Sequence, residues 1–74
     1  MLDEKTFYAY IGKMFGKDAE ALGPTTRLHE DLDATSQQYF GVSALLEKLT
    51  GEKIGFAQIN NCTTLADVIE LTQE

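Results

Sequence analysis

Apolar residues recur at helical spacing in three stretches of this chain, and each stretch opens with a residue type that commonly caps a helix N-terminus. The first stretch follows Asp3 and ends before Gly16, a residue that suits the left-handed position after a helix. Its apolar positions are Phe7, Tyr10, Ile11, Met14 and Phe15. This spacing predicts a helix over residues 3–15 whose apolar stripe packs into the core.

The second predicted helix begins at Thr35 and ends before Gly51. The run Thr35-Ser36-Gln37-Gln38 has the S/T-x-x-E/Q form of a capping box, with the threonine as N-cap. The predicted apolar face of this helix consists of Phe40, Val42, Leu45, Leu46 and Leu49. The interior Gly41 costs roughly 0.5–1 kcal/mol relative to alanine. It marks either a close approach by another segment or no special contact, and we favour the second interpretation.

The C-terminal third predicts two further helical segments. Residues 56–61 contain two apolar residues three positions apart, which indicates one or two turns. The last helix begins at Thr63 or Thr64, because Thr64 and Asp67 form another capping signal. Its predicted inward face is Leu65, Val68, Ile69 and Thr72. No segment alternates apolar and polar residues for long enough to indicate a strand. The predicted fold class is therefore all-α, a small four-helix bundle of three main helices and one short helix.

Residues 16–35 form a long first loop that is rich in glycine, proline and threonine. Structureless loops longer than about 12–15 residues are uncommon in compact domains unless they are functional or packed down. We expect Leu22, Leu28 and Leu32 to pack this loop against the helices, and residues 19–22 to add a short helical turn.

The 74 residues suffice for one domain, residues 1–74, with a thin core. The net charge of −6 disfavours nucleic acid and anionic membranes as partners and favours proteins with positive patches. Cys62 and His29 are the only cysteine and histidine, so we expect no disulfide, no metal site and no enzyme activity. We expect Cys62 to be small, mostly buried and unreactive, and His29 to be a solvated loop residue. No signal peptide or membrane span is apparent, which favours a cytoplasmic location.

Ser36 is the residue whose position has a chemical implication. Its hydroxyl lies at the predicted start of the second helix, where Thr35 already provides the cap. A helix N-terminus offers free N–H donors and a positive potential that suit a phosphate ester. No general base lies nearby in the sequence, so Ser36 is a poor catalyst but could serve as the substrate of a modifying enzyme. By spacing alone, an ordinary serine at a helix start is the simpler interpretation.

Over its whole length the chain resembles an acyl carrier protein. Members of that family are small acidic four-helix proteins with a long first loop and an E-D-L-G-A-D-S-L motif at the start of the second helix. The corresponding residues here are Glu30-Asp31-Leu32-Asp33-Ala34-Thr35-Ser36-Gln37. Further residues that fall where the family has similar ones are Gly12, Gly16, Leu28, Ile54, Thr63 and Thr64. All of these segments align with the family pattern without a gap.

The resemblance implies that Ser36 carries 4′-phosphopantetheine, which a phosphopantetheinyl transferase installs from coenzyme A. The thiol of this group would hold acyl intermediates as thioesters, and the protein, a cytoplasmic monomer, would present them to enzymes of fatty-acid, polyketide or related biosynthesis. The implied residues for docking these partners are Asp31, Asp33, Thr35, Gln37, Gln38, Gly41 and Glu47. By analogy, an acyl pocket between the helices would be lined by Phe40, Leu46, Ile54, Ile59, Cys62 and Leu65. Tyr39 would contact the prosthetic arm or a partner, or else cover the edge of the core.

Two departures from the family pattern concern the partners. Thr35 and Gln37 replace the usual aspartate and leucine beside the serine, which lowers the expected efficiency of modification. The second helix has no acidic residue before Glu47, and the acids gather just before Ser36 instead. We therefore expect a specialised carrier that serves its own enzymes. The alternative, which rests on the flanking substitutions, is a carrier-like protein-interaction module that is not modified.

Overall fold

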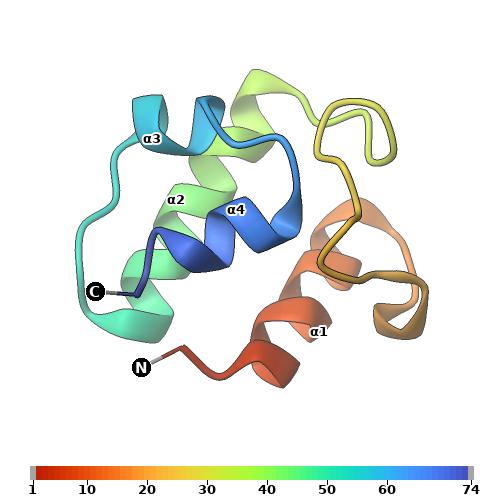
Figure 1. Ribbon diagram of the computed structural model, residues 1–74, viewed down its shortest axis with the longest axis horizontal. Helices are drawn as coiled ribbons and strands as arrows, with labels where there is room; N and C mark the ends of the chain where they lie inside the picture. The colour runs from red at the N-terminus through yellow and green to blue at the C-terminus, as the bar shows by residue number, and fades with distance from the viewer. Residues whose placement is uncertain (1, 74) are drawn as a thin grey trace.

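A computed structural model describes residues 2–73 of the chain, and these residues form a small all-α bundle (Figure 1). The helices are α1 (Glu4–Phe15), α2 (Ser36–Thr50), α3 (Phe56–Asn60) and α4 (Leu65–Glu70), with a 3-10 turn η1 (Ala19–Ala21) in the first loop. The predicted fold class is confirmed. The last helix is shorter than expected, since α4 ends before Thr72, whose hydroxyl donates to the Ile69 carbonyl.

The predicted capping residues account for where the helices begin. The Asp3 carboxylate accepts the Lys5 N–H at the start of α1. At the start of α2, the Thr35 hydroxyl accepts the Gln38 N–H at 3.2 Å and the Gln38 side chain accepts the Thr35 N–H at 2.9 Å. At the start of α4, a second reciprocal pair joins Thr64 and Asp67. Each pair satisfies N–H groups that have no acceptor within their own helix.

The core draws on every helix and on the first loop. α2 packs against both α1 and α3, and α1 also contacts η1. The buried apolar side chains are Leu2, Phe7, Ile11, Leu28, Leu32, Val42, Leu45, Leu46, Ile54, Ile59, Leu65, Val68 and Ile69. The leucines expected to pack down the first loop do so, with Leu28 and Leu32 buried and Leu22 half-buried.

The inward face predicted for α2 is wrong at Phe40, whose side chain is 60% exposed. The buried residues Val42, Leu45 and Leu46 define the inward stripe, and Phe40 lies about 200° around the helix from Val42. The residue that continues this stripe toward the N-terminus is Tyr39, three positions before Val42, and it is half-buried. Phe40 instead stacks on Phe56 of α3, with ring centroids 4.3 Å apart.

Backbone hydrogen bonds join the first loop to the start of α4. The Leu28 N–H donates to the Thr63 carbonyl and the Leu65 N–H donates to the Thr26 carbonyl, both at 2.9 Å. An isolated antiparallel bridge between Arg27 and Thr64 lies within this contact. Figure 1 shows the loop, drawn in orange to yellow, passing beside the first turn of α4. The first loop is therefore fixed in two ways, by the packing of its leucines in the core and by its backbone hydrogen bonds to the start of α4.

Gly41 of α2 marks a close approach, so the interpretation favoured from the sequence is wrong. A Cβ atom at Gly41 would lie 3.3 Å from Cε and 3.4 Å from Sδ of Met14. Gly12 of α1 is tighter, because a Cβ there would lie 2.5 Å from the backbone oxygen of Lys17. These two glycines let α1 pack against α2 and against the start of the first loop.

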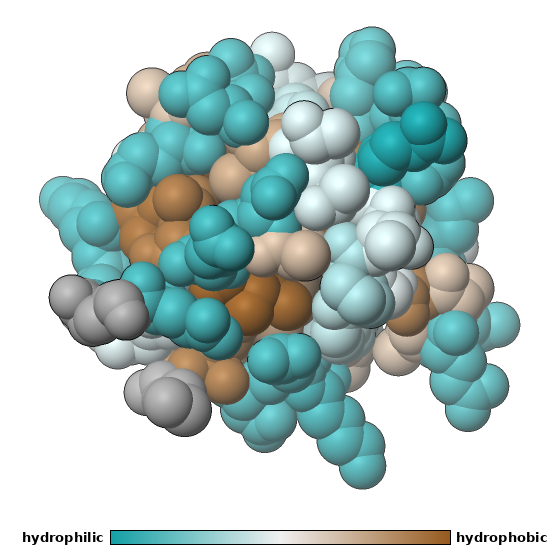
Figure 2. Space-filling view, in the orientation of Figure 1, coloured by the Kyte–Doolittle hydropathy of each residue, from teal (hydrophilic) through white to brown (hydrophobic). Residues whose placement is uncertain are grey.

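The surface that Figure 2 displays alternates hydrophilic side chains with brown apolar areas, chiefly on the side where α2, α3 and α4 meet. A domain of this size leaves much apolar surface uncovered, because its surface is large relative to its volume. None of the helices between residues 2 and 73 has both the length and the apolar content that crossing a bilayer requires.

Candidate functional site

Ser36 is the first residue of α2, and its side chain is exposed. Within residues 2–73 its hydroxyl makes no hydrogen bond to another protein group, because Thr35 performs the capping. The Tyr39 N–H is the first to reach back to a carbonyl, that of Thr35, at 3.0 Å. The N–H groups of Ser36 and Gln37 therefore lie free at the positive end of a 15-residue helix. This arrangement suits an anionic group on the Ser36 oxygen.

Arg27 partly neutralises the acidic residues that precede Ser36 in the sequence. Its guanidinium pairs with Glu30 at 3.1 Å and with Asp31 at 3.3 Å. The Asp31 carboxylate also accepts the Arg27 backbone N–H at 2.8 Å. These hydrogen bonds, the backbone one first, lower the pKa of Asp31. Asp33 is the acid of this stretch whose carboxylate has no hydrogen-bond or ion-pair partner in the described part of the chain.

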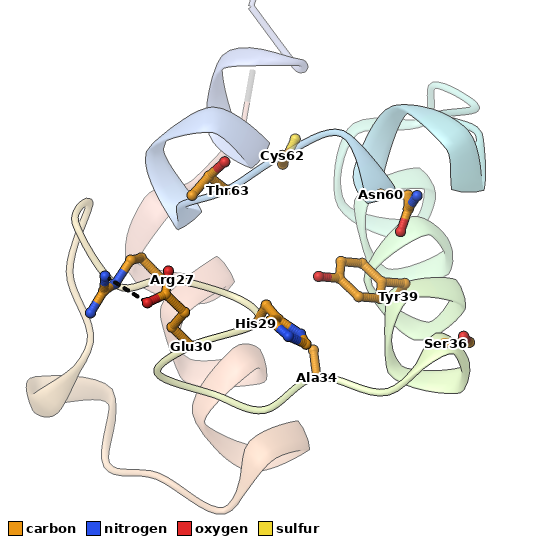
Figure 3. Close-up of a pocket in the computed structure, with 9 residues that line it drawn as sticks. All are labelled: Arg27, His29, Glu30, Ala34, Ser36, Tyr39, Asn60, Cys62 and Thr63. Carbon is orange, nitrogen blue, oxygen red and sulfur yellow. Dashed lines mark hydrogen bonds and ion pairs between the residues drawn. The ribbon is translucent and has the colours of Figure 1, made fainter.

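A surface pocket of about 430 Å³ lies beside Ser36 (Figure 3). Figure 3 shows Tyr39 reaching from α2 toward His29 of the first loop, with Asn60 at the end of α3 on the other side of the ring. Cys62 and Thr63, in the connection to α4, form the far side of the group, and Ser36 lies at its edge. The lining residues are Arg27, His29, Glu30, Ala34, Ser36, Tyr39, Asn60, Cys62 and Thr63.

This pocket differs from the acyl pocket expected by analogy. Of the six residues expected there, only Cys62 lines it. Four others are buried in the core, namely Leu46, Ile54, Ile59 and Leu65, and Phe40 is exposed. Sequence reasoning proposed Tyr39 as a contact for the arm but did not propose His29, Asn60 or Thr63. Asn60 and Thr63 are near neighbours in the sequence, but nothing in the sequence links them to His29. The backbone contact between the first loop and the start of α4 brings His29 to them.

The Cys62 thiol is not prepared for nucleophilic chemistry. It is half-buried, and its sulfur donates to the Gln58 carbonyl at 3.4 Å. Burial, followed by the negative charges of Asp67 and Glu70, raises the pKa of Cys62 to about 11. The thiol is therefore protonated at neutral pH, in agreement with the expected unreactive role. No group of three or more potential metal-binding side chains forms among residues 2–73.

The expected docking residues occupy different environments around α2. Gln37 and Glu47 are exposed, Gln38 is engaged in the capping box and Gly41 lies against Met14. The outward face that starts at Ser36 continues through Phe40, Ala44 and Glu47, all exposed and at helical spacing. The stacked pair of Phe40 and Phe56 therefore lies on the same side of α2 as Ser36.

A family model described as the phosphopantetheine attachment site matches residues 5–72 of the chain. The chain belongs to this family. The prosthetic group of phosphopantetheine carriers is 4′-phosphopantetheine, which is attached covalently. The resemblance to acyl carrier proteins is thereby confirmed. A comparison with curated proteins finds no significant match.

The residues of this carrier fit the prosthetic group. The Ser36 hydroxyl is exposed and unused, and the free N–H groups of Ser36 and Gln37 suit its phosphate. When bound, the group would supply a terminal thiol, which can form thioesters. The protein supplies an accessible oxygen, a positive helix end and a pocket beside it.

Proposed function

We propose that this chain is an acyl carrier protein whose Ser36 hydroxyl holds 4′-phosphopantetheine through a phosphodiester. The observation that carries the proposal is the exposed hydroxyl of Ser36, which Thr35 leaves unused at the start of α2. A phosphopantetheinyl transferase supplies the group from coenzyme A, whose pyrophosphate bond breaks as the serine ester forms and adenosine 3′,5′-bisphosphate leaves. The carrier is a cytoplasmic monomer and presents its thioesters to the enzymes of a biosynthetic pathway without catalysing their reactions.

The intact mass of the protein tests this proposal. Incubation with coenzyme A and a promiscuous transferase should add the mass of one phosphopantetheine. Ser36→Ala should abolish the gain. Ser43→Ala is the matched control, since Ser43 lies in the same helix, donates to the Ile54 carbonyl and should leave the gain intact. If wild-type protein gains no mass with any active transferase, the alternative of an unmodified interaction module is favoured.

The partner enzymes, we propose, dock along α2 and the loop before it, at Asp31, Asp33, Thr35, Gln37, Gln38, Gly41 and Glu47. The exposed face of α2 carries Phe40, which stacks on Phe56 of α3, and α2 has no acidic residue before Glu47. Arg27 also offsets two of the acids that precede Ser36. These features support a specialised carrier whose own enzymes present a more apolar surface. Fatty-acid synthase enzymes should use the acylated protein as an acyl donor more slowly than their own carrier. Equal rates with the two carriers would contradict the proposal.

An acyl pocket in the core stays a prediction. Leu46, Ile59 and Leu65 have no exposed surface, so an acyl chain can enter among them only if these side chains move apart. We expect an octanoyl thioester to shift their methyl resonances more than an acetyl thioester does. Unchanged methyl resonances would show that the octanoyl chain remains outside the core.

A further inference from the structure

The pocket beside Ser36 gathers polar side chains that have no partner in the protein. Within residues 2–73, the side chains of His29, Tyr39, Asn60 and Thr63 make no hydrogen bond to another protein group. In contrast, Arg27 and Glu30 at the rim pair with each other. The four unpaired side chains come from the first loop, α2, α3 and the connection to α4, and all line the pocket. Figure 3 shows Tyr39 between His29 and Asn60, with the Thr63 hydroxyl turned away from them. The pocket therefore offers hydrogen-bonding capacity that the fold does not use.

We propose that this pocket is the resting site of the pantetheine arm, a flexible chain with a hydroxyl group and two amide groups. The inference rests on the proposed attachment of the arm to Ser36. Because Ser36 itself lines the pocket, an arm attached there starts at the edge of the pocket. The docked arm runs from the start of α2 toward Cys62 and Thr63.

The chemistry of the pocket matches such a chain. An amide needs one donor and one acceptor, and the Tyr39 hydroxyl and the Asn60 amide supply both. The Tyr39 ring and the Ala34 methyl group offer apolar contact for the dimethyl carbon of the arm. The volume of about 430 Å³ lies within the range of about 300–1,000 Å³ that is usual for small-molecule sites. A long alkyl chain would leave the polar side chains without partners, so the arm suits the pocket better than an acyl cargo.

Nuclear magnetic resonance on the modified protein tests this inference. The arm is labelled with ¹³C and ¹⁵N, and the intact mass of the same sample is measured by mass spectrometry to establish that Ser36 is modified. We expect nuclear Overhauser contacts between the dimethyl group and the Tyr39 ring, shifts at His29, Asn60 and Thr63, and order parameters of the arm amides above about 0.6. A modified sample without these contacts, whose arm amides stay below about 0.6, overturns the inference and leaves the proposed function intact.

Two conservative variants test the hydrogen bonds. Tyr39→Phe keeps the ring that meets Phe56 edge-on but removes the hydroxyl, and Asn60→Ala removes the amide. Each should lower the ratio of docked to free arm by about fivefold. Asn61→Ala is the control, because Asn61 is the exposed neighbour of Asn60 and does not line the pocket. Equal effects of Asn60→Ala and Asn61→Ala would overturn the inference.

Two further outcomes also decide the question. If the arm of the modified carrier is free and the pocket resonances shift only when a processing enzyme is added, the pocket serves a side chain of the partner and the inference is wrong. If the protein gains no phosphopantetheine mass with any active transferase, the proposed function is wrong, and the inference is wrong with it.

Discussion

At the scale of single residues, Asp33 adopts a backbone conformation that its side chain does not favour. Its φ of 51° is in the left-handed region, where residues with a Cβ are strained and glycine is not. The family motif has glycine at this position. Asp33 is thus a third departure from the motif. It directly follows the turn of residues 28–32 and lies three positions before Ser36, so the strain lies near the site.

We expect Asp33→Gly to raise the free energy of unfolding by about 0.5–1 kcal/mol, because it relieves this strain. Urea denaturation of the unmodified protein measures the effect. Asp18→Gly is the control, since Asp18 is also an exposed loop aspartate but has an ordinary φ of −71° and no side-chain capping bond. A loss of stability in Asp33→Gly as large as that in Asp18→Gly would contradict the explanation.

At the scale of the helices, Gly12 of α1 and Gly41 of α2 have similar sequence contexts but different neighbours. The atom next to Gly12 is fixed, and the atom next to Gly41 can move. The neighbour of Gly12 is the Lys17 backbone oxygen, which cannot move without displacing the end of α1 and the start of the first loop. The neighbour of Gly41 is the end of the flexible Met14 side chain. The identity of the neighbouring atom therefore decides the effect of an added methyl group.

Gly12→Ala should destabilise the protein by about 2 kcal/mol or more, because a contact of 2.5 Å forces the backbone apart. Gly41→Ala should stabilise it by a few tenths of a kcal/mol up to about 1 kcal/mol, since alanine favours a helix and Met14 can move aside. Thermal and urea unfolding of the two variants measure both signs. Destabilisation of equal size by the two variants would show that the Met14 side chain is not free to adjust.

At the scale of the whole molecule, carboxylates bind the backbone where the first loop meets α4. Asp67 accepts the N–H groups of Thr64 and Thr63, and these hydrogen bonds lower its pKa. Asp31 has a lowered pKa for a similar reason, at the Arg27 end of the same contact. A lowered pKa in the folded state means that the ionised carboxylate contributes stability above its ordinary value of 3.8 and loses it as the pH falls through the folded value.

We therefore expect the free energy of unfolding to fall as the pH drops below about 4, where ordinary aspartates take up a proton. Asp67→Asn should be less stable than wild type at pH 7, because its amide replaces a charged acceptor at the α4 N-terminus. The difference should narrow toward pH 3. Urea denaturation of both proteins from pH 7 to pH 3 measures it, and a difference that does not change with pH would contradict the assignment.

Local signals in the sequence determined the helix starts and the position of Ser36. Asp3, Thr35 and Thr64 were predicted as N-caps because a cap depends on hydrogen bonds to residues two or three positions away. The inward stripes of α1 and α4 follow from helical geometry and were largely predicted in the same way. That Ser36 begins a helix and that Thr35 leaves its hydroxyl unused are thus properties of four consecutive residues.

The tertiary structure alone decided which distant residues share the space beside Ser36. His29 and Thr63 are far apart in the sequence, and the hydrogen bonds between the first loop and the start of α4 bring them to one pocket. The same is true of Gly41 and Met14, and of the stack that leaves Phe40 exposed. Periodicity can assign a residue to a face of its own helix, but which face another segment covers depends on how the whole chain packs.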